Sequence, residues 1–398
     1  MSIFGRAKKK KVIAVLDIAS AAVGGMLIEQ SDKSSLSQGS SRSKSELIKV
    51  ISAVRKPVNF LFDVDFEASW RCSADALDKV MVKLLKDFPR GPDAVLCVFS
   101  SPWFAPQIKI INIKKEKPFE IKRNFFDELL VSEGENFKKT YLSLESPPKN
   151  EMEFIERENI KTEINGYLTE YPIGKKAKTI KIDFYFSLGV KQVIDEVKKE
   201  ILENFGDVPL LFKTSPPLVF FVLNKIMRVK ENFLVVDIGG EVTDIYLIKN
   251  NVLNKVASFQ RGINFLIRNI TAELNTFIGE ASSILKTYLR GHRSPESSKK
   301  VEAAVKQAKE EWSLSFNKTI ADMAENAPLP QTAFLLSDKI ADKLFVDRMQ
   351  SDDLVKFTIL GKPLRIINIK PDWLLHYFDF ASIKTTASNE SGFIADQG

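Results

Sequence analysis

Apolar runs and small-residue turns alternate along the chain in a pattern that predicts an α/β protein built twice on one plan. In the first half, residues 12–30 predict a β-hairpin, and residues 47–54 predict the strand that extends it. In the second half, residues 234–241 and 243–249 predict another hairpin, and residues 252–260 predict its third strand. The repetition predicts a duplicated architecture with two related domains.

Apolar residues at helical spacing follow the strands in both halves. Helices are predicted at 74–87, 192–205, 264–277, 280–290 and 301–324, with helix starts at 124–130 and 371–380. Further strands are predicted at 94–99, 107–113, 153–163, 178–188, 332–337 and 364–369. The Ser-rich residues 31–45 lack periodicity and are predicted to form a flexible loop. A strand–helix–strand–strand insert is therefore predicted inside the first domain, at about residues 92–175.

Size and composition set broad limits. A chain of 398 residues is too long for one ordinary core, so two or more domains are expected. Its 44% apolar and 27% charged residues are typical of a soluble globular protein. Two cysteines and two histidines have no spacing suited to a metal, which favours a reducing, cytoplasmic compartment without a disulfide framework.

The positive charge is concentrated at the start of the chain. Of the net charge of +7, five positive charges lie in the first eleven residues: Arg6, Lys8, Lys9, Lys10 and Lys11. The rest of the chain is close to neutral, which argues against a nucleic-acid-binding body. Because Ile3 and Phe4 precede the basic residues, we hypothesise peripheral contact of this leader with an anionic membrane. The alternative is a solvated basic leader. No apolar run reaches the 18 or so residues of a membrane span.

Two apolar strands end in an aspartate followed by small residues, and they carry the clearest chemical signal. The first ends at Asp17 and the second at Asp237. A carboxylate at a strand end can hold Mg²⁺ through waters, and small residues let backbone N–H groups approach phosphate oxygens. In the second stretch Gly239 and Gly240 supply the close backbone. The alternative is a structural turn that needs Asp and Gly for its geometry.

Both stretches resemble the two phosphate motifs of the actin-like ATPase superfamily, and most closely those of the FtsA cell-division family. The segments 162–167 and 172–177 resemble the end of a small insert that FtsA proteins carry between these motifs. Residues 211–223 lie where that family has the strand and helix before its second motif. The pilus-assembly protein PilM shares the fold and the insert, so it is the rival resemblance.

The resemblance implies two actin-like, ribonuclease H-like domains flanking a nucleotide cleft. The expected organisation is a tail (1–11), domain I (12–91), the SHS2-type insert (92–175), a return to domain I with the crossover (176–230), domain II (231–383) and a polar tail (384–398). The implied ligands are ATP and Mg²⁺, with the metal held through water by Asp17 and Asp237. The implied nucleotide-binding residues are Asp17, Ala19, Ser20, Asp237, Gly239, Gly240, Thr243, Asp244, Gly262 and Lys286.

Departures from the family pattern predict an eroded nucleotide site. Ala19 replaces a glycine of the first motif, and Glu241 replaces a glycine of the second, where its carboxylate would repel the γ-phosphate unless it turns away. The expected Gly-rich turn near adenosine reads Ser337-Asp338-Lys339 instead. We therefore expect weak or absent ATP hydrolysis.

Three functions remain open from the sequence. The resemblance to FtsA implies a structural scaffold that links FtsZ-type filaments to the inner face of the cell membrane, with self-association and other division proteins as further partners. The resemblance to PilM implies a pilus or secretion scaffold that binds a peptide of a membrane protein. The third is an active ATPase or kinase of the superfamily, which Ala19 and the turn after Ser337 disfavour. No nucleic-acid partner is expected.

Overall fold

The computed structural model describes residues 11–30, 48–63, 65–143, 150–227, 231–290, 298–337 and 339–369. The leader up to residue 10 (and with it Ile3, Phe4, Arg6, Lys8, Lys9 and Lys10), the loop predicted at 31–45, the helix start predicted at 371–380 and the polar tail lie outside these residues. In the described part of the chain, no helix is long and apolar enough to cross a membrane.

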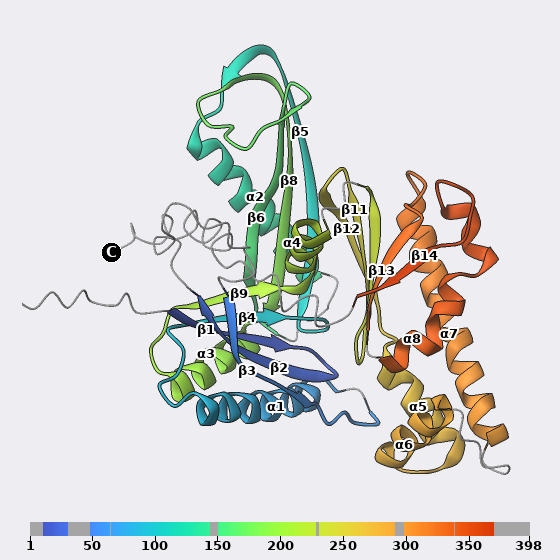
Figure 1. Cartoon of the computed structure of the whole chain (residues 1–398). Helices are drawn as coiled ribbons and strands as arrows, with labels where there is room; N and C mark the ends of the chain where they lie inside the picture. Colours follow the sequence, from blue (N-terminus) through green and yellow to red (C-terminus); the bar gives the residue numbers. More distant parts are fainter. Residues whose placement is uncertain are drawn as a thin grey trace, which may run out of the picture.

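The first domain is built on a five-stranded sheet in the order β3-β2-β1-β4-β9 (Figure 1). Its strands are β1 (Lys11–Ile18), β2 (Ala22–Gln30), β3 (Ile48–Pro57), β4 (Ala94–Phe99) and β9 (Leu210–Thr214). The β1–β2–β3 part is antiparallel, whereas β4 and β9 run parallel to β1. Helices α1 (Phe66–Asp87) and α3 (Lys191–Phe205) cover one face, because their buried apolar stripes pack with those of the strands.

The second domain repeats this sheet in the order β12-β11-β10-β13-β14. Its strands are β10 (Phe233–Ile238), β11 (Thr243–Lys249), β12 (Val252–Phe259), β13 (Thr332–Ser337) and β14 (Arg365–Asn368). Its helices are α5 (Ile263–Leu274), α6 (Ile278–Leu289), α7 (Ser298–Ala324), α8 (Lys339–Met349) and a 3₁₀ helix (Asp352–Phe357). Asp17 pairs with Gly24 across the first hairpin as Asp237 pairs with Asp244 across the second, so the duplication extends to the register. The predicted fold class, a duplicated α/β architecture, is confirmed.

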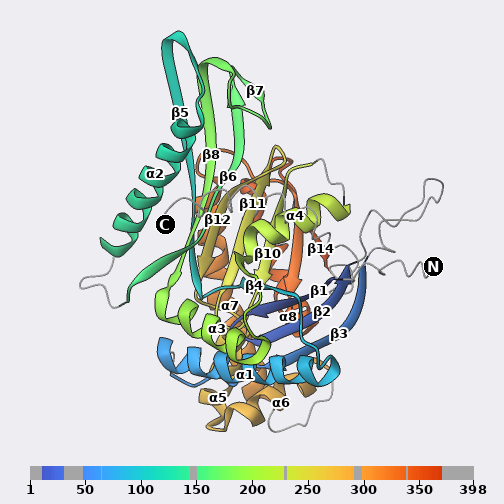
Figure 2. The ribbon, with the colours of Figure 1, turned by 90° about the vertical axis from the view of Figure 1, so that its left-hand side faces the viewer.

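The insert forms a third sheet in the order β5-β8-β6-β7, with one helix beside it (Figure 2). Its elements are β5 (Phe104–Glu120), α2 (Arg123–Ser143), β6 (Met152–Ile164), β7 (Tyr167–Leu168) and β8 (Lys176–Val190). The boundaries predicted at 92 and 175 are wrong. Strand β4 belongs to the first sheet, and β8, which was assigned to the return to domain I, is the central strand of the insert. The sheet pairing places the insert between Phe104 and Val190.

A buried polar network fastens the insert to the first domain. The Glu156 carboxylate of β6 accepts hydrogen bonds from the Thr214 amide of β9 at 2.9 Å and from the Thr214 hydroxyl. Tyr185 of β8 shares a hydrogen bond with the same hydroxyl at 2.7 Å, and Lys213 forms ion pairs with Glu156 and Glu158. Burial, with a smaller contribution from Glu158, raises the pKa of Glu156 to about 7.

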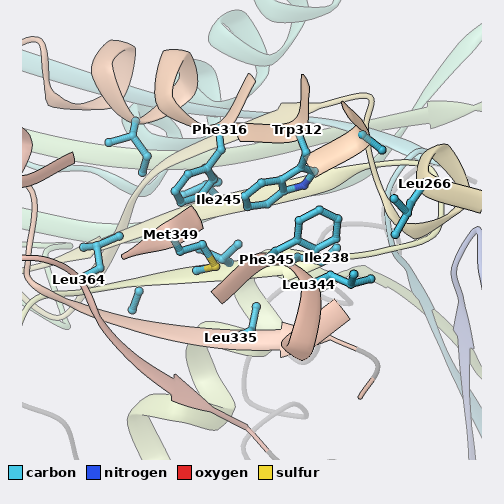
Figure 3. Packing of buried hydrophobic residues seen from close by; sticks show 14 of the residues in the cluster. Ile238, Ile245, Leu266, Trp312, Phe316, Leu335, Leu344, Phe345, Met349 and Leu364 are labelled. Atoms are coloured by element: carbon cyan, nitrogen blue, oxygen red, sulfur yellow. The ribbon is translucent and has the colours of Figure 1, made fainter. Parts of the chain in front are cut away.

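The core of the second domain is centred on Trp312 of α7 (Figure 3). Its indole stacks on Phe316 at 4.8 Å and on Phe345 of α8 at 4.5 Å between ring centroids. Its Nε1–H donates to the Thr243 hydroxyl at 3.1 Å, so the only polar atom of this buried side chain has a partner. This contact fixes α7 against the start of β11. Helix α8, which directly follows β13, was not predicted.

Candidate functional site

The two aspartate-tipped strands end close together, at the junction of the two domains. A methyl group added to Gly240 would lie 2.8 Å from the amide nitrogen of Ala21, so the loop after β10 touches the loop after β1. The Glu241 amide donates to the Ser20 hydroxyl at 3.0 Å. A second bond between the domains joins the Ser101 hydroxyl to Asp244 at 2.9 Å. The loops that were predicted to face each other across a groove are therefore in direct contact.

Three carboxylates gather behind these loops. Asp17 pairs with the Arg55 guanidinium at 3.1 Å, and Asp244 accepts hydrogen bonds from Ser101 and, at 2.5 Å, from Ser258. Burial, together with the negative charges of Asp244 and Asp17, raises the pKa of Asp237 from 3.8 to about 8, and Arg55 opposes this rise only weakly. Burial also raises the pKa of Asp244, to about 6. Asp237 is therefore mostly protonated near neutral pH.

The Glu241 side chain turns away from the loops and forms an ion pair within the second domain. Both of its oxygens accept from the Arg268 guanidinium, each at 2.7 Å, and Asn264 donates to one of them at 2.8 Å. Arg268 Nε also donates to the Leu61 carbonyl of the first domain at 2.9 Å, and the guanidinium lies 5.2 Å from the Phe60 ring centroid. One arginine thus satisfies the glutamate and joins the domains.

The glycines of the second motif serve backbone packing. A methyl group on Gly262 would lie 2.4 Å from the Gly239 carbonyl oxygen and 2.3 Å from that of Gly240. The same two carbonyls accept hydrogen bonds from the first amides of α5, those of Ile263 and Asn264, at 3.0 and 2.9 Å. The N-terminus of α5 therefore binds loop carbonyls, in a position where its amides would otherwise be available to an anion.

The remaining predicted residues are divided between this junction and the surface. Thr243 is fully buried; its hydroxyl donates to the Arg261 carbonyl at 2.7 Å and accepts from Trp312. Ala19 lies beside Ser20 in the loop after β1. Lys286 is exposed on α6, a helix that contacts α5, α7 and α8. On the adenosine side, α8 begins two residues after Ser337, whose hydroxyl bonds to Asp342 of that helix.

The groups at this junction, in the arrangement described, do not fit a nucleoside triphosphate. The Gly239 amide donates to the Val242 carbonyl at 3.0 Å and the Glu241 amide donates to Ser20, so two amides of the phosphate-type loop are already used. The Ala21 backbone lies against Gly240, where phosphate oxygens would need room. Among the described residues, no group of three or more His, Cys, Asp or Glu side chains is arranged to hold a metal ion. Asp17 and Asp237 lie near each other, but the first is paired and the second favours its neutral form.

Sequence reasoning missed the partners that satisfy the site: Arg55, Ser100, Ser101, Ser258, Asn264 and Arg268. Two of these groups had a detectable signal. Ser100 and Ser101 directly follow β4, which runs parallel to β1, and parallel strands present their carboxyl ends at one sheet edge. Asn264 and Arg268 are four residues apart and therefore share one face of helix α5.

No protein-family model matches the chain, and no curated protein matches it. Solved structures do match over nearly its whole length, and together with the duplicated sheets they establish the actin-like ATPase fold. The chain is similar to the PilM-PilN type IV pilus biogenesis complex, with 15% identity, a TM-score of 0.58, and coverage of 97% of this chain and 99% of that chain. At this identity the similarity establishes the fold and leaves the specific resemblance to FtsA as a prediction.

Two more distant similarities have lower scores. The ethanolamine utilization protein EutJ from Carboxydothermus hydrogenoformans is 12% identical, with a TM-score of 0.43 over 93% of this chain and 89% of that one. The MamK double helical filament is 10% identical, with a TM-score of 0.44 over 93% of this chain and 98% of that one.

Replacing Asp237 by asparagine should remove part of the pH dependence of stability. Since the pKa of Asp237 is about 8 in the folded chain, the folded state keeps a proton that the unfolded state releases above about pH 4. The free energy of unfolding should therefore fall as pH rises from about 4 to about 8. At pH 8 the Asp237→Asn variant should be more stable than wild type by at least about 1 kcal/mol in urea denaturation. The matched control is Asp353→Asn, at an exposed residue of the 3₁₀ helix, which should follow the wild-type curve. Equal pH slopes for Asp237→Asn and wild type would contradict the assignment.

Removing the Arg268 side chain should destabilise the protein strongly. Both members of the Glu241–Arg268 pair are only 14% exposed, so Arg268→Ala leaves a largely buried carboxylate without its cation. We expect a loss of about 3 kcal/mol in the free energy of unfolding, and a smaller loss when Glu241→Ala is added. Arg90→Ala breaks an exposed pair with Asp93 and should cost under about 1 kcal/mol. Equal losses in the free energy of unfolding for Arg268→Ala and Arg90→Ala would contradict this prediction, because they would show that burial does not increase the cost of breaking the pair.

Proposed function

We propose that this chain is an actin-like structural scaffold whose ATP site is eroded and hydrolyses ATP weakly or not at all. The observation that carries the proposal is the direct contact between the two phosphate-type loops, in which the Ser20 hydroxyl and the Ala21 backbone lie against Gly240 and Glu241. Hydrolysis by this fold requires a positioned phosphate chain, and positioning accounts for most of phosphoryl-transfer catalysis. A cleft closed by the chain itself favours an assembly role and disfavours the alternative of an active ATPase or kinase.

Calorimetric titration of the full-length chain with Mg-ATP tests this proposal. We expect no saturable heat in the micromolar range and no phosphate release above background. The matched control for trace activity is Asp237→Asn, since turnover that persists unchanged in that variant must come from a contaminant. Micromolar binding together with steady turnover that Asp237→Asn abolishes would refute the eroded site.

For the partner, we propose a protein of an envelope-associated assembly. The resemblance of the two aspartate motifs to FtsA supports a division scaffold that links FtsZ-type filaments to the inner face of the membrane, with self-association and a peripheral, cytoplasmic location. A specific observation also supports the second candidate: the pilus complex matches this chain over nearly the full length of both. In that candidate the chain would hold a peptide of a pilus or secretion membrane protein.

Capture on the immobilised full-length chain separates the two candidates. FtsZ from the same organism and the cytoplasmic segment of its pilus inner-membrane protein are offered in parallel at equal concentration. Retention of FtsZ alone supports the division role, and retention of the pilus segment alone supports the pilus role. If a correctly folded chain retains neither, both partner assignments are wrong, whereas the absence of ATP turnover would still stand on its own measurement.

A further inference from the structure

The far end of the insert presents large apolar side chains to solvent. We call residues 114–123 and 165–178 the insert tip. They comprise the end of β5 up to the first residue of α2, the turn after β6, strand β7, the loop that follows it and the start of β8. Within it, Tyr167 and Tyr171 are 77% and 78% exposed, and Leu168 and Ile173 are 69% and 49% exposed. Exposed apolar side chains gathered at one place mark interaction surfaces, whereas scattered ones need no explanation.

The insert tip is also strongly basic. Its exposed basic residues are Lys114, Lys115, Lys117, Lys122, Arg123, Lys175, Lys176 and Lys178. Its acidic residues are Glu116, Glu120 and Glu170. Eight positive against three negative side chains give this end an excess of +5, as large as that of the leader. The chain beyond the leader is near neutral as a whole, but the fold concentrates positive charge at this end and leaves the remainder net negative.

Backbone hydrogen bonds hold the insert tip in shape. The Asn165 side-chain oxygen accepts from the amides of Lys178 and Thr179 at 2.9 and 3.1 Å, which closes the turn formed by Asn165 and Gly166. The loop after β7 is tied to the end of β5, because the Gly174 amide donates to the Ile121 carbonyl at 2.8 Å and the Ile121 amide donates to the Lys175 carbonyl at 2.9 Å. The exposed tyrosines and lysines therefore project from an ordered framework.

The insert tip lies at one extremity of the molecule. In both Figure 1 and Figure 2 the ends of β5 and β8 project beyond the two actin-like domains. The buried network of Glu156, Thr214 and Lys213 anchors the other end of the insert to β9. Because the insert is anchored at its opposite end, the insert tip can reach a surface without obstruction by the rest of the chain.

We propose that the insert tip docks on an anionic lipid surface. Tyrosine rings are favoured at membrane–water interfaces, where the apolar ring and the polar hydroxyl each find a suitable environment. Each basic residue close to an anionic surface increases partition roughly fivefold. Basic and aromatic side chains project together from a convex end, and a deformable interface can surround them all. A rigid acidic protein would need a hollow of matching shape.

Sedimentation with vesicles tests this proposal on the full-length chain. The probes are vesicles of phosphatidylcholine alone and of phosphatidylcholine with phosphatidylglycerol. We expect binding only to the anionic vesicles, weakened by added salt because exposed charges are screened. Tyr167→Ser with Tyr171→Ser, and separately Lys175→Glu with Lys176→Glu, should each lower the partition coefficient at least about tenfold. All four side chains are exposed, so circular dichroism should remain that of wild type.

Matched controls change an exposed aromatic residue and two exposed lysines elsewhere on the surface. Phe277→Ser removes a side chain that is 83% exposed on the second domain, and Lys299→Glu with Lys300→Glu reverses two exposed charges on α7. Both should bind vesicles as wild type does. In a Tyr167→Trp variant, lipids with brominated acyl chains should quench the added fluorescence, which binding to a protein would not do.

Removal of residues 1–11 separates the insert tip from the leader. If the shortened chain still binds anionic vesicles and the variants of the insert tip do not, the proposal holds. It is overturned if the wild-type chain does not bind anionic vesicles. It is equally overturned if the variants of the insert tip bind as wild type does and only removal of the leader abolishes binding. It is also overturned if an acidic polypeptide is bound through the insert tip while the vesicles are not.

Discussion

The contact between the loops after β1 and β10 is the constraint on which the rest of the structure depends. Gly240 touches the Ala21 backbone, and the Glu241 amide bonds to Ser20, so the two sheets meet at a fixed distance and orientation. Two further bonds join the domains beside this contact, from Ser101 to Asp244 and from Arg268 to the Leu61 carbonyl. A side chain at Gly240 or Gly262 would push backbone against backbone.

The closed junction also explains the electrostatics of the buried carboxylates. Asp17, Asp237 and Asp244 lie close together with the Arg55 guanidinium as their nearby cation. Ionised carboxylates so close together would repel one another, so Asp237 keeps its proton near neutral pH, whereas the Ser101 and Ser258 hydroxyls donate hydrogen bonds to Asp244. The site therefore holds both strand-end aspartates in an arrangement that favours the neutral form of Asp237.

The sequence alone predicted the duplicated fold, but it did not predict the residues that bind the carboxylates of the site. Apolar strands that end in Asp17 and Asp237 are local patterns, and the fold they predicted is present. The insert boundaries failed because the sheet that a strand joins depends on distant pairing partners, which are β1 and β9 for β4 but β5 and β6 for β8. Arg55 was missed because it lies 38 residues from Asp17, and no local pattern records such a contact. The spacing of Arg268 and Asn264 marks a shared helix face, but it does not identify their partner Glu241, 27 residues before Arg268.

The attachment of the insert has a mechanical consequence. Strand β6 is joined to β9 by Glu156 and Thr214, and β9 runs parallel to β4 in the first sheet. A pull on the insert would act on these lateral bonds and on the short chain segment between β4 and β5, and both routes lead into the sheet that contains β1 and its Ser20 loop. A force applied to the insert would therefore reach the junction between the two domains.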